Sequence, residues 1–306
     1  MSPSPLPAWT RRDFLAGGLG AAGLAVVAAA CANSHKVINV PNPSQTTSAA
    51  NQTNLGVITA LVVAGINQRV AFVIQGQNGF ITPTGPVSFA LGPDEQHLTP
   101  FPVTIHSDAL GAPTYLSLEH TFATAGVYVA EVGLNGKTAT AGFTVVTPAS
   151  EPSPVPGRAI PSLATPTTAD LHSIDPSLLC TRTPVCPLHS VSLDVALKAA
   201  KPIALLFATP KFCQTATCGP TLDVLLRQMP PYASKIQFLH MEIYPKPPDL
   251  SSAATPTTTY VVDAFKITSE PILFLVGADG KVRERIDGLV GDAEVKAALD
   301  RLSSAG

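Results

Sequence analysis

A stretch rich in proline, serine and threonine at residues 148–178 divides this chain of 306 residues into two parts of different character. Before it, apolar residues occur in short strand-like runs separated by Gly, Pro, Asn and Asp. After it, strand-like runs alternate with segments of helical periodicity. Charge changes at nearly the same place, because residues 1–180 carry 15 charged side chains and residues 181–306 carry 25. We therefore expect two domains of different fold class, joined by an extended proline-rich linker at 148–178.

The composition excludes a disordered chain and argues against a nucleic-acid partner. Hydrophobic residues make up 45% of the sequence, which is ample for buried cores. The formal net charge is −2 and the isoelectric point is about 6.4, so there is no basic field to hold nucleic acid. We expect no cofactor and no resident metal.

The N-terminal residues form a candidate export signal. Thr10-Arg11-Arg12-Asp13-Phe14-Leu15 opens a run without charge that extends to residue 30. This pattern resembles a twin-arginine signal, in which Arg11 and Arg12 would be the recognised pair. An ordinary signal peptide or an uncleaved anchor is the alternative. Each of these predicts an exported protein of the bacterial cell envelope, which touches the membrane only through its N-terminus.

Two outcomes are open where the signal, residues 1–32, ends. Ala28-Ala29-Ala30-Cys31 resembles a lipoprotein box, which would attach a lipid to Cys31, but it lacks the leucine usually found three residues before the cysteine. Cleavage at a nearby Ala-x-Ala site is the competing interpretation. Residues 33–54 are polar and nearly uncharged, which predicts a tether that does not fold alone.

The segment 55–147 is expected to be an all-β sandwich. It holds seven β-rich runs, at 57–64, 69–75, 86–91, 101–106, 115–121, 127–133 and 137–146. Asn135-Gly136 between the last two runs is a strong hairpin signal. The segment 122–128 resembles the late strand of immunoglobulin-like modules. The segment contains no cysteine, so packing alone would hold it together.

The segment 179–306 is expected to be an α/β domain with a mixed sheet. Its pattern predicts helices at about 191–200, from near 219, at 259–266 and at 292–302. Strands are predicted at 203–207, 236–243, 272–276 and 281–286.

Residues of about 190–303 resemble the thioredoxin superfamily. The strand 203–207 is followed by Phe212-Cys213-Gln214-Thr215-Ala216-Thr217-Cys218-Gly219-Pro220, and much later comes Ser269-Glu270-Pro271 before a strand and an Asp-Gly turn. This is the order of a redox cysteine, a proline loop and a closing hairpin in thioredoxins. The resemblance implies that Pro271 is cis and that the carbonyl before it orients the substrate chain.

The chain departs from the thioredoxin pattern at the second cysteine. Cys218-Gly219-Pro220 matches the first three positions of Cys-Gly-Pro-Cys, but Thr221 occupies the fourth. Cys213 is the near neighbour, and we expect a Cys213–Cys218 disulfide. A helix beginning near Cys218 would favour its thiolate, so Cys218 is expected to attack and Cys213 to resolve. The buried acid of thioredoxins has no counterpart at the matching place.

Cys180 and Cys186 form a second pair in an irregular segment before the first helix. In an oxidising compartment a local Cys180–Cys186 disulfide is the plainest interpretation. The alternatives are electron exchange with the first pair, cross-pairing between the two pairs, free thiols, and zinc binding by all four cysteines with His189, although the spacings match no zinc module. His240 and Met241 raise the further alternative of copper binding, since one thioredoxin-fold class of copper chaperones uses two cysteines and a distant histidine.

These observations predict an exported thioredoxin-like thiol–disulfide oxidoreductase that acts through a Cys-x4-Cys pair. Its partners would be protein thiols and disulfides outside the cytoplasm, together with a redox partner that recycles the site. The alternative is a non-catalytic binding or structural protein of the cell envelope whose thioredoxin-like domain has lost turnover. Copper delivery is the third interpretation.

Overall fold

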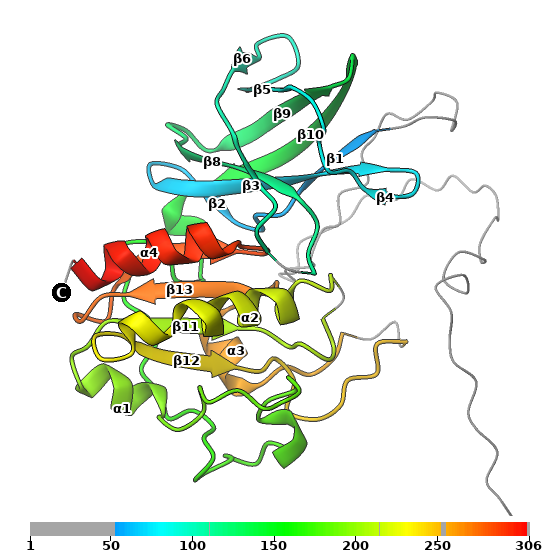
Figure 1. The fold of residues 1–306 in the computed structure, drawn as a ribbon. Coiled ribbons are helices and arrows are strands. Elements are labelled where there is room, and N and C mark those ends of the chain that lie inside the picture. Colours follow the sequence, from blue (N-terminus) through cyan, green and yellow to red (C-terminus); the bar gives the residue numbers. More distant parts are fainter. Residues whose placement is uncertain (1–52, 110, 214, 252–254, 305–306) are drawn as a thin grey trace, which may run out of the picture. The chain divides into compact units, whose positions relative to one another are not determined.

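The computed structural model describes residues 53–109, 111–213, 215–251 and 255–304 (Figure 1). The predicted export signal, with Arg11, Arg12 and Cys31, lies outside the described residues. Among the residues described, no helix combines the length and the apolar character needed to cross a membrane.

The first domain consists of two β-sheets packed face to face, as the seven β-rich runs predict. One sheet has the strand order β1-β3-β8-β7, with β4 beside β3, and the other has the order β2-β10-β9-β5-β6. The strands of the first sheet are β1 (Asn54–Val57), β3 (Asn67–Gly76), β4 (Gly79–Phe80), β7 (Thr104–His106) and β8 (Tyr115–Thr121). Those of the second are β2 (Val62–Val63), β5 (Val87–Gly92), β6 (Thr99–Pro100), β9 (Gly126–Leu134) and β10 (Lys137–Val146).

The hairpin between β9 and β10 forms where the sequence predicts it. Lys137 pairs with Leu134, which leaves Asn135 and Gly136 as a two-residue turn. Both turn residues have positive φ, 51° and 74°, the conformation that Asn and Gly adopt most readily. This turn fixes the register of the two longest neighbouring strands of the second sheet.

Residues 148–178 have an irregular backbone apart from short 3-10 helices at Pro148–Ser150 and Pro176–Leu178, and they pack against the second domain. The N–H of Gly157 donates to the carbonyl of Val282, and the N–H of Ile160 donates to the carbonyl of Gly280. Val155, Ile160 and Leu178 are buried. The predicted linker therefore has the expected irregular backbone, with apolar side chains that anchor it to the α/β domain.

The second domain has a mixed four-stranded sheet in the order β12-β11-β13-β14. Strand β11 is parallel to β12 and antiparallel to β13, and β13 is antiparallel to β14. The elements are α1 (Leu193–Lys198), β11 (Ile203–Phe207), α2 (Cys218–Gln228), β12 (Gln237–Met241), α3 (Tyr260–Phe265), β13 (Ile272–Val276), β14 (Val282–Asp287) and α4 (Asp292–Ser304). Each of the predicted helices and strands of this domain is present.

Helices cover both faces of this sheet because side chains alternate along its central strand. Ala204 and Leu206 of β11 face a core that contains the apolar side chains of α2 and α4. Ile203, Leu205 and Phe207 face a second core with α1 and α3. All five residues of β11 are fully buried, which places the end of this strand, and the loop that follows it, on a rigid support.

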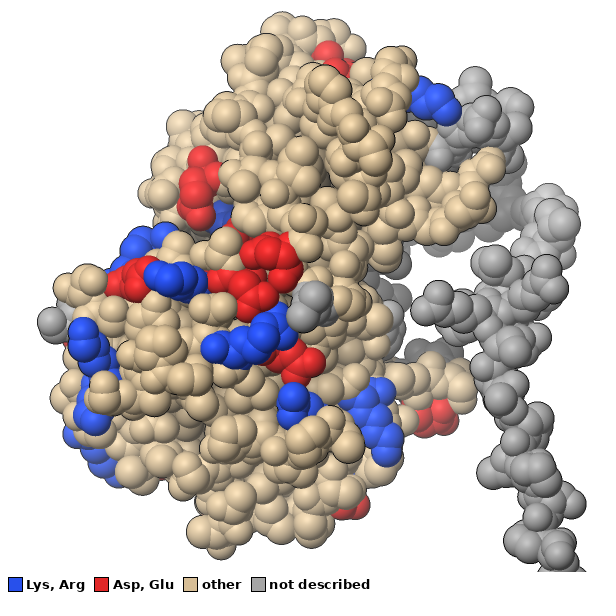
Figure 2. Space-filling view, viewed as in Figure 1, with Lys and Arg blue, Asp and Glu red and all other residues tan. Residues whose placement is uncertain are grey.

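Charged side chains concentrate on the α/β domain. On the face shown in Figure 2, most Lys, Arg, Asp and Glu lie over α4 and the elements below it, and the sandwich carries few. This distribution agrees with the change in charge near residue 180 of the sequence.

A buried ion pair joins the sandwich to α4. Arg69 of β3 is 5% exposed, and its Nε lies 2.9 Å from Oε1 of Glu294. Its guanidinium also donates to the carbonyls of Leu289, at 2.5 Å, and Asp287, at 3.2 Å. The hydroxyl of Tyr115 donates to the same Glu294 carboxylate and accepts from the N–H of Gly291. One guanidinium thus satisfies a carboxylate and two carbonyls at once.

Arg69→Ala is expected to lower the free energy of unfolding by about 3–5 kcal/mol, because the substitution leaves the Glu294 charge buried without its partner. Urea unfolding monitored by circular dichroism measures the loss. Lys296→Ala is the control, since the Lys296–Asp300 pair lies on the exposed face of α4 and its removal should leave the midpoint nearly unchanged. Equal small shifts for both variants would show that the buried pair is not structurally important.

Candidate functional site

The loop after β11 and the first residue of α2 place two cysteines side by side. Cys213 lies in the loop and is half-buried, whereas Cys218 begins α2 and is fully buried. Helix α2 sets this difference, because Leu222 and Leu225 of the same helix pack into the core between α2 and the sheet. The side chain of Cys218 joins that core, and Cys213 packs at its edge.

The sulfur of Cys213 lies among hydrogen-bond donors at the start of α2. The backbone N–H of Cys218 donates to Sγ of Cys213 at 3.3 Å, and Oγ1 of Thr215 lies 3.3 Å from the same sulfur. Both sulfurs and a carboxylate oxygen of Glu270 lie within 4.8 Å of one another. Among the described residues no disulfide joins the two cysteines, and the Cys213–Cys218 disulfide stays a prediction.

The surroundings of the two thiols shift their pKa values in opposite directions. The hydrogen bond from Cys218 is the main cause that lowers the pKa of Cys213 to about 5, against the opposing effect of burial, and Thr215 and backbone amides add to it. Burial, followed by the neighbouring Cys213, raises the pKa of Cys218 well above its usual range. At neutral pH Cys213 is therefore the thiolate and Cys218 holds the proton.

This arrangement favours the reverse of the roles expected from the sequence. A nucleophile must be deprotonated and accessible, and the half-buried Cys213 meets both conditions. Cys218 begins the helix as expected, but its side chain points into the core instead of toward solvent. The dipole and amides of α2 act on the neighbouring sulfur, as the N–H bond to Cys213 demonstrates.

Iodoacetamide should alkylate Cys213 with a rate that follows its thiolate fraction, half-maximal near pH 5 because its pKa is about 5. The rate is at its plateau at neutral pH and falls as the pH drops through 5. Peptide mass spectrometry of timed samples measures the rate at each cysteine. The control is the unfolded protein, in which both thiols should have a pKa of about 8.5. Half-maximal labelling of native Cys213 near the unfolded value would contradict the assignment.

Glu270 is a site residue that the sequence analysis missed. It lies in the loop before β13, where its carboxylate approaches both sulfurs. Burial raises its pKa to about 7, and the charge of the Cys213 thiolate adds to the shift. The acid lies beside the proline loop and not in the first core strand, where thioredoxins have theirs. The signal available in the sequence was an acidic residue directly before Pro271.

Pro271 occupies the place expected from the resemblance, directly before β13. The Glu270–Pro271 peptide bond is cis, as the resemblance implies. The carbonyl of Pro271 accepts from the N–H of Gly288, which ties the loop to the end of β14. A second cis bond precedes Pro184, in the segment between Cys180 and Cys186.

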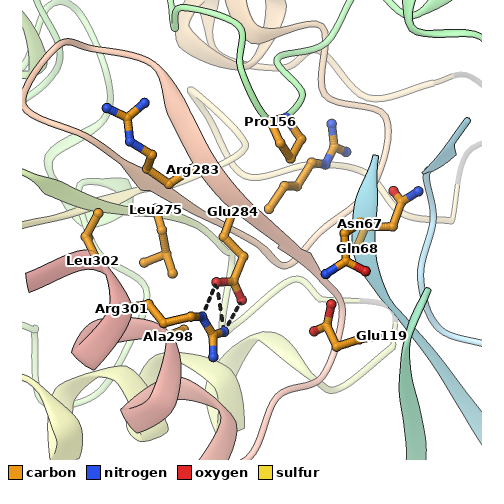
Figure 3. Close-up of a pocket in the computed structure, with 11 residues that line it drawn as sticks. Asn67, Gln68, Glu119, Pro156, Leu275, Arg283, Glu284, Ala298, Arg301 and Leu302 are labelled. Carbon is orange, nitrogen blue, oxygen red and sulfur yellow. Dashed lines mark hydrogen bonds and ion pairs between the residues drawn. The ribbon is translucent and has the colours of Figure 1, made fainter. Parts of the chain in front are cut away.

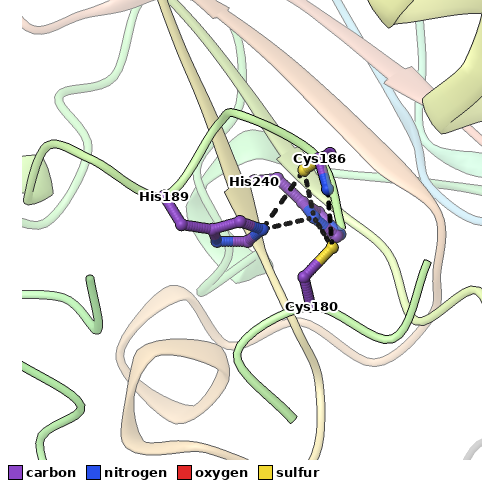
Figure 4. A group of neighbouring side chains, drawn as sticks. All are labelled: Cys180, Cys186, His189 and His240. Carbon is purple, nitrogen blue, oxygen red and sulfur yellow. Dashed lines mark hydrogen bonds between the residues drawn. The ribbon is translucent and has the colours of Figure 1, made fainter. Parts of the chain in front are cut away.

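Cys180 and Cys186 do not join the first pair. They form a separate buried group with His189 and His240, shown in Figure 4. Both are free cysteines in the structure, so their disulfide also stays a prediction. His240, which the sequence analysis named only for the copper alternative, is 1% exposed and lies on β12 with its ring turned toward the two sulfurs.

A cavity of about 390 Å³ lies away from both cysteine groups. Its lining comes from β3, β8, the hairpin of β13 and β14, and α4, and Figure 3 shows the ion pair of Arg301 and Glu284 within it. Burial, and the nearby charge of Glu284, raise the pKa of Glu119 on its wall. Cys180, Cys186, Cys213 and Cys218 are not among its lining residues.

Comparisons with known proteins give structural neighbours only. No protein-family model and no curated protein matches the chain. A candidate thiol:disulfide interchange protein DsbE from Chlorobium tepidum is 18% identical, with 50% of this chain and 98% of that chain covered and a TM-score of 0.34. A thiol:disulfide interchange protein of the thioredoxin family from Chlorobium tepidum TLS is 17% identical, covers 49% and 97% of the two chains and has a TM-score of 0.34. The Lin-41 filamin domain is 11% identical, with 30% and 91% covered and a TM-score of 0.22.

Proposed function

We propose that the α/β domain is thioredoxin-like and catalyses thiol–disulfide exchange through Cys213 and Cys218. The observation that carries the proposal is the pairing of a half-buried thiolate with a buried thiol beside an acid whose pKa is about 7. The fold assignment is supported by the strand order β12-β11-β13-β14, by the cysteines that follow the central strand, and by the cis proline before β13. The sandwich would be an immunoglobulin-like module that precedes it.

In the proposed reaction the Cys213 thiolate attacks one sulfur of a protein disulfide. A mixed disulfide forms, the substrate S–S bond breaks, and the second substrate sulfur leaves as a thiolate that takes a proton from solvent. Cys218 then loses its proton and attacks the Cys213 sulfur. The Cys213–Cys218 disulfide forms, the bond between Cys213 and the first substrate sulfur breaks, and that sulfur leaves as a thiolate that takes a proton. A dithiol reductant returns the pair to the thiol form, and the reverse sequence oxidises a substrate dithiol.

Glu270 is proposed to accept the proton of Cys218 during the second step. A buried thiol with a raised pKa attacks slowly unless a nearby base removes its proton. Glu270 lies within 4.8 Å of the sulfur, and a pKa of about 7 lets it take and release a proton near neutral pH. Pro271 would orient the substrate chain, as the resemblance implies.

We also infer export to the cell envelope through the twin-arginine pattern at Arg11 and Arg12, with Cys31 either lipid-modified or removed with the signal. The substrates would then be proteins outside the cytoplasm that carry thiols or disulfides. Intact mass of the mature protein distinguishes a lipid-bearing Cys31 from plain cleavage.

Insulin reduction in the presence of dithiothreitol tests the proposed function. The wild-type protein is expected to accelerate the precipitation of the insulin chains, and Cys213→Ser is expected to reduce the rate to that of dithiothreitol alone. A second assay follows the refolding of a protein that has been reduced or that carries scrambled disulfides. If the wild-type protein and the variant are equally inactive in both assays, the oxidoreductase proposal fails. The non-catalytic binding or structural role then becomes the better account.

A further inference from the structure

Four potential metal ligands meet in the core near the loop between β11 and α2, which holds Cys213 and is called the redox loop below. Cys180 and Cys186 lie in the segment before α1, His189 follows three residues later, and His240 lies on β12. Their exposed fractions are 7%, 4%, 3% and 1% in that order. The backbone N–H of His240 donates to the carbonyl of Leu188, which holds the irregular segment against β12. Figure 4 shows both sulfurs and both rings directed toward one another.

The distances among these four donors fit a tetrahedral zinc ion. Sγ of Cys186 lies 3.2 Å from Nε2 of His189 and 3.5 Å from Nδ1 of His240. Sγ of Cys180 lies 3.9 Å from Nδ1 of His240, and the two ring nitrogens lie 3.2 Å apart. Zinc bonds of about 2.3 Å to sulfur and about 2.0–2.1 Å to nitrogen require tetrahedral separations of roughly 3.6 Å for S···N and roughly 3.3 Å for N···N.

The atoms around the donors also suit a metal. Nε2 of His240 lies 3.0 Å from the carbonyl oxygen of Ala208, an acceptor, so this nitrogen carries the proton and Nδ1 faces the sulfurs with its lone pair. Such an outer hydrogen bond is typical of histidine ligands. The N–H of Cys186 donates to Sγ of Cys180 at 3.4 Å, which stabilises negative charge on that sulfur.

Charge balance favours a divalent ion with these ligands. Two thiolates and two neutral imidazoles carry a charge of −2, which a Zn²⁺ ion neutralises, so the occupied group could be buried without net charge. The four ligands form no recognisable zinc motif in the sequence, because His240 follows 51 residues after His189 and lies on a strand. Strand β12 meets the segment that holds the other three through the hydrogen bond from the backbone N–H of His240 to the carbonyl of Leu188.

We propose that Cys180, Cys186, His189 and His240 bind one Zn²⁺ ion in a closed structural site. All four positions of the tetrahedron are filled by protein, so the site is built to hold the chain and not to bind a substrate. It fastens the segment 180–189 to β12, and through the Ala208 carbonyl to the start of the redox loop. The N–H of Lys211 donates to Oγ1 of Thr181, which joins the same segment to that loop a second time.

Metal analysis of the full chain, purified without chelators or added metal, tests the proposal. We expect about one zinc per chain in the wild-type protein and in the Cys213→Ser/Cys218→Ser variant, which keeps all four ligands. His189→Gln and Cys186→Ser are expected to lose the zinc. Peptide mass spectrometry should find Cys180 and Cys186 protected from iodoacetamide until a chelator removes the ion.

Cobalt substitution keeps the test decisive if the ligand variants do not fold. The wild-type protein reloaded with Co²⁺ should develop the intense visible bands of a tetrahedral site together with thiolate-to-cobalt charge transfer. A Cys180–Cys186 disulfide in the zinc-free native protein would overturn the proposal and restore the pairing expected from the sequence. One copper per chain in place of zinc, or cobalt spectra typical of six-coordinate oxygen ligands, would also overturn it.

Discussion

Cys218→Ser is expected to convert the protein from a catalyst into a trap for its substrates. Cys213 keeps its position and the N–H bond from residue 218, so it still attacks a substrate disulfide. The serine hydroxyl cannot displace the substrate, and the mixed disulfide should persist on the order of minutes to hours, as uncatalysed exchange does. Non-reducing gels and intact mass measure the adduct, and turnover of insulin should fall to background.

The matched control is Cys213→Ser, which retains the buried thiol. Because Cys218 is fully buried and protonated, this variant should form no adduct under the same conditions. Circular dichroism confirms that each variant is folded. The opposite result would be an adduct on Cys218 in the Cys213→Ser protein and none on Cys213 in the Cys218→Ser protein. Cys218 would then be the attacking thiol and Cys213 the resolving one, as expected from the sequence.

Glu270→Gln is expected to slow the resolution of the mixed disulfide by roughly 10²-fold or more, the usual contribution of a positioned general base. In the wild-type protein the rate of resolution should rise with pH, because Glu270 accepts a proton only after it has lost its own. The inflection is expected at or below about pH 7, since Cys213 carries no charge in the mixed disulfide and one cause of the raised pKa is removed. The variant should lose this inflection.

Rapid acid quenching of a single turnover, with mass detection of the mixed disulfide, measures the rate. Glu95→Gln on the exposed surface of the sandwich is the control and should leave the pH profile unchanged. Glu270→Asp should recover part of the rate, because it restores a carboxylate at a longer distance. A Glu270→Gln profile identical to that of the wild type would remove Glu270 from the mechanism.

Local pattern was enough to predict the elements of the α/β domain and most strands of the sandwich. It merged β1 and β2, which lie in different sheets, into one run at 57–64, and it missed the two-residue strands β4 and β6. The run 203–207 is apolar throughout because both faces of β11 are covered by helices. Asn135-Gly136 specified its hairpin because the positive φ values of a two-residue turn exclude most other residues. These features depend on neighbours in sequence, and a single sequence contains that information.

The properties of the site depend on contacts between segments distant in sequence, and these could not be read from the chain. The roles proposed for Cys213 and Cys218 are based on burial, which is set by how α2 packs on the sheet. Glu270 reaches the sulfurs only because the loop before β13 lies beside α2. By composition the linker 148–178 is expected to be an isolated spacer, but its backbone forms hydrogen bonds with residues 280–282, and Ile160 shares a core with Val282 of β14.

If Cys213 and Cys218 cycle between dithiol and disulfide, a redox titration in glutathione buffers should give the reduction potential of the pair. Peptide mass spectrometry of acid-quenched samples reports the fraction of the pair that is oxidised at each potential. The pKa of Cys213, about 5, lies between those of the attacking cysteines in thioredoxin, about 7, and DsbA, about 3.5. We therefore expect half-oxidation between roughly −270 and −120 mV. A pair that stays oxidised below about −300 mV, as structural disulfides do, or that never forms a disulfide, would contradict the account.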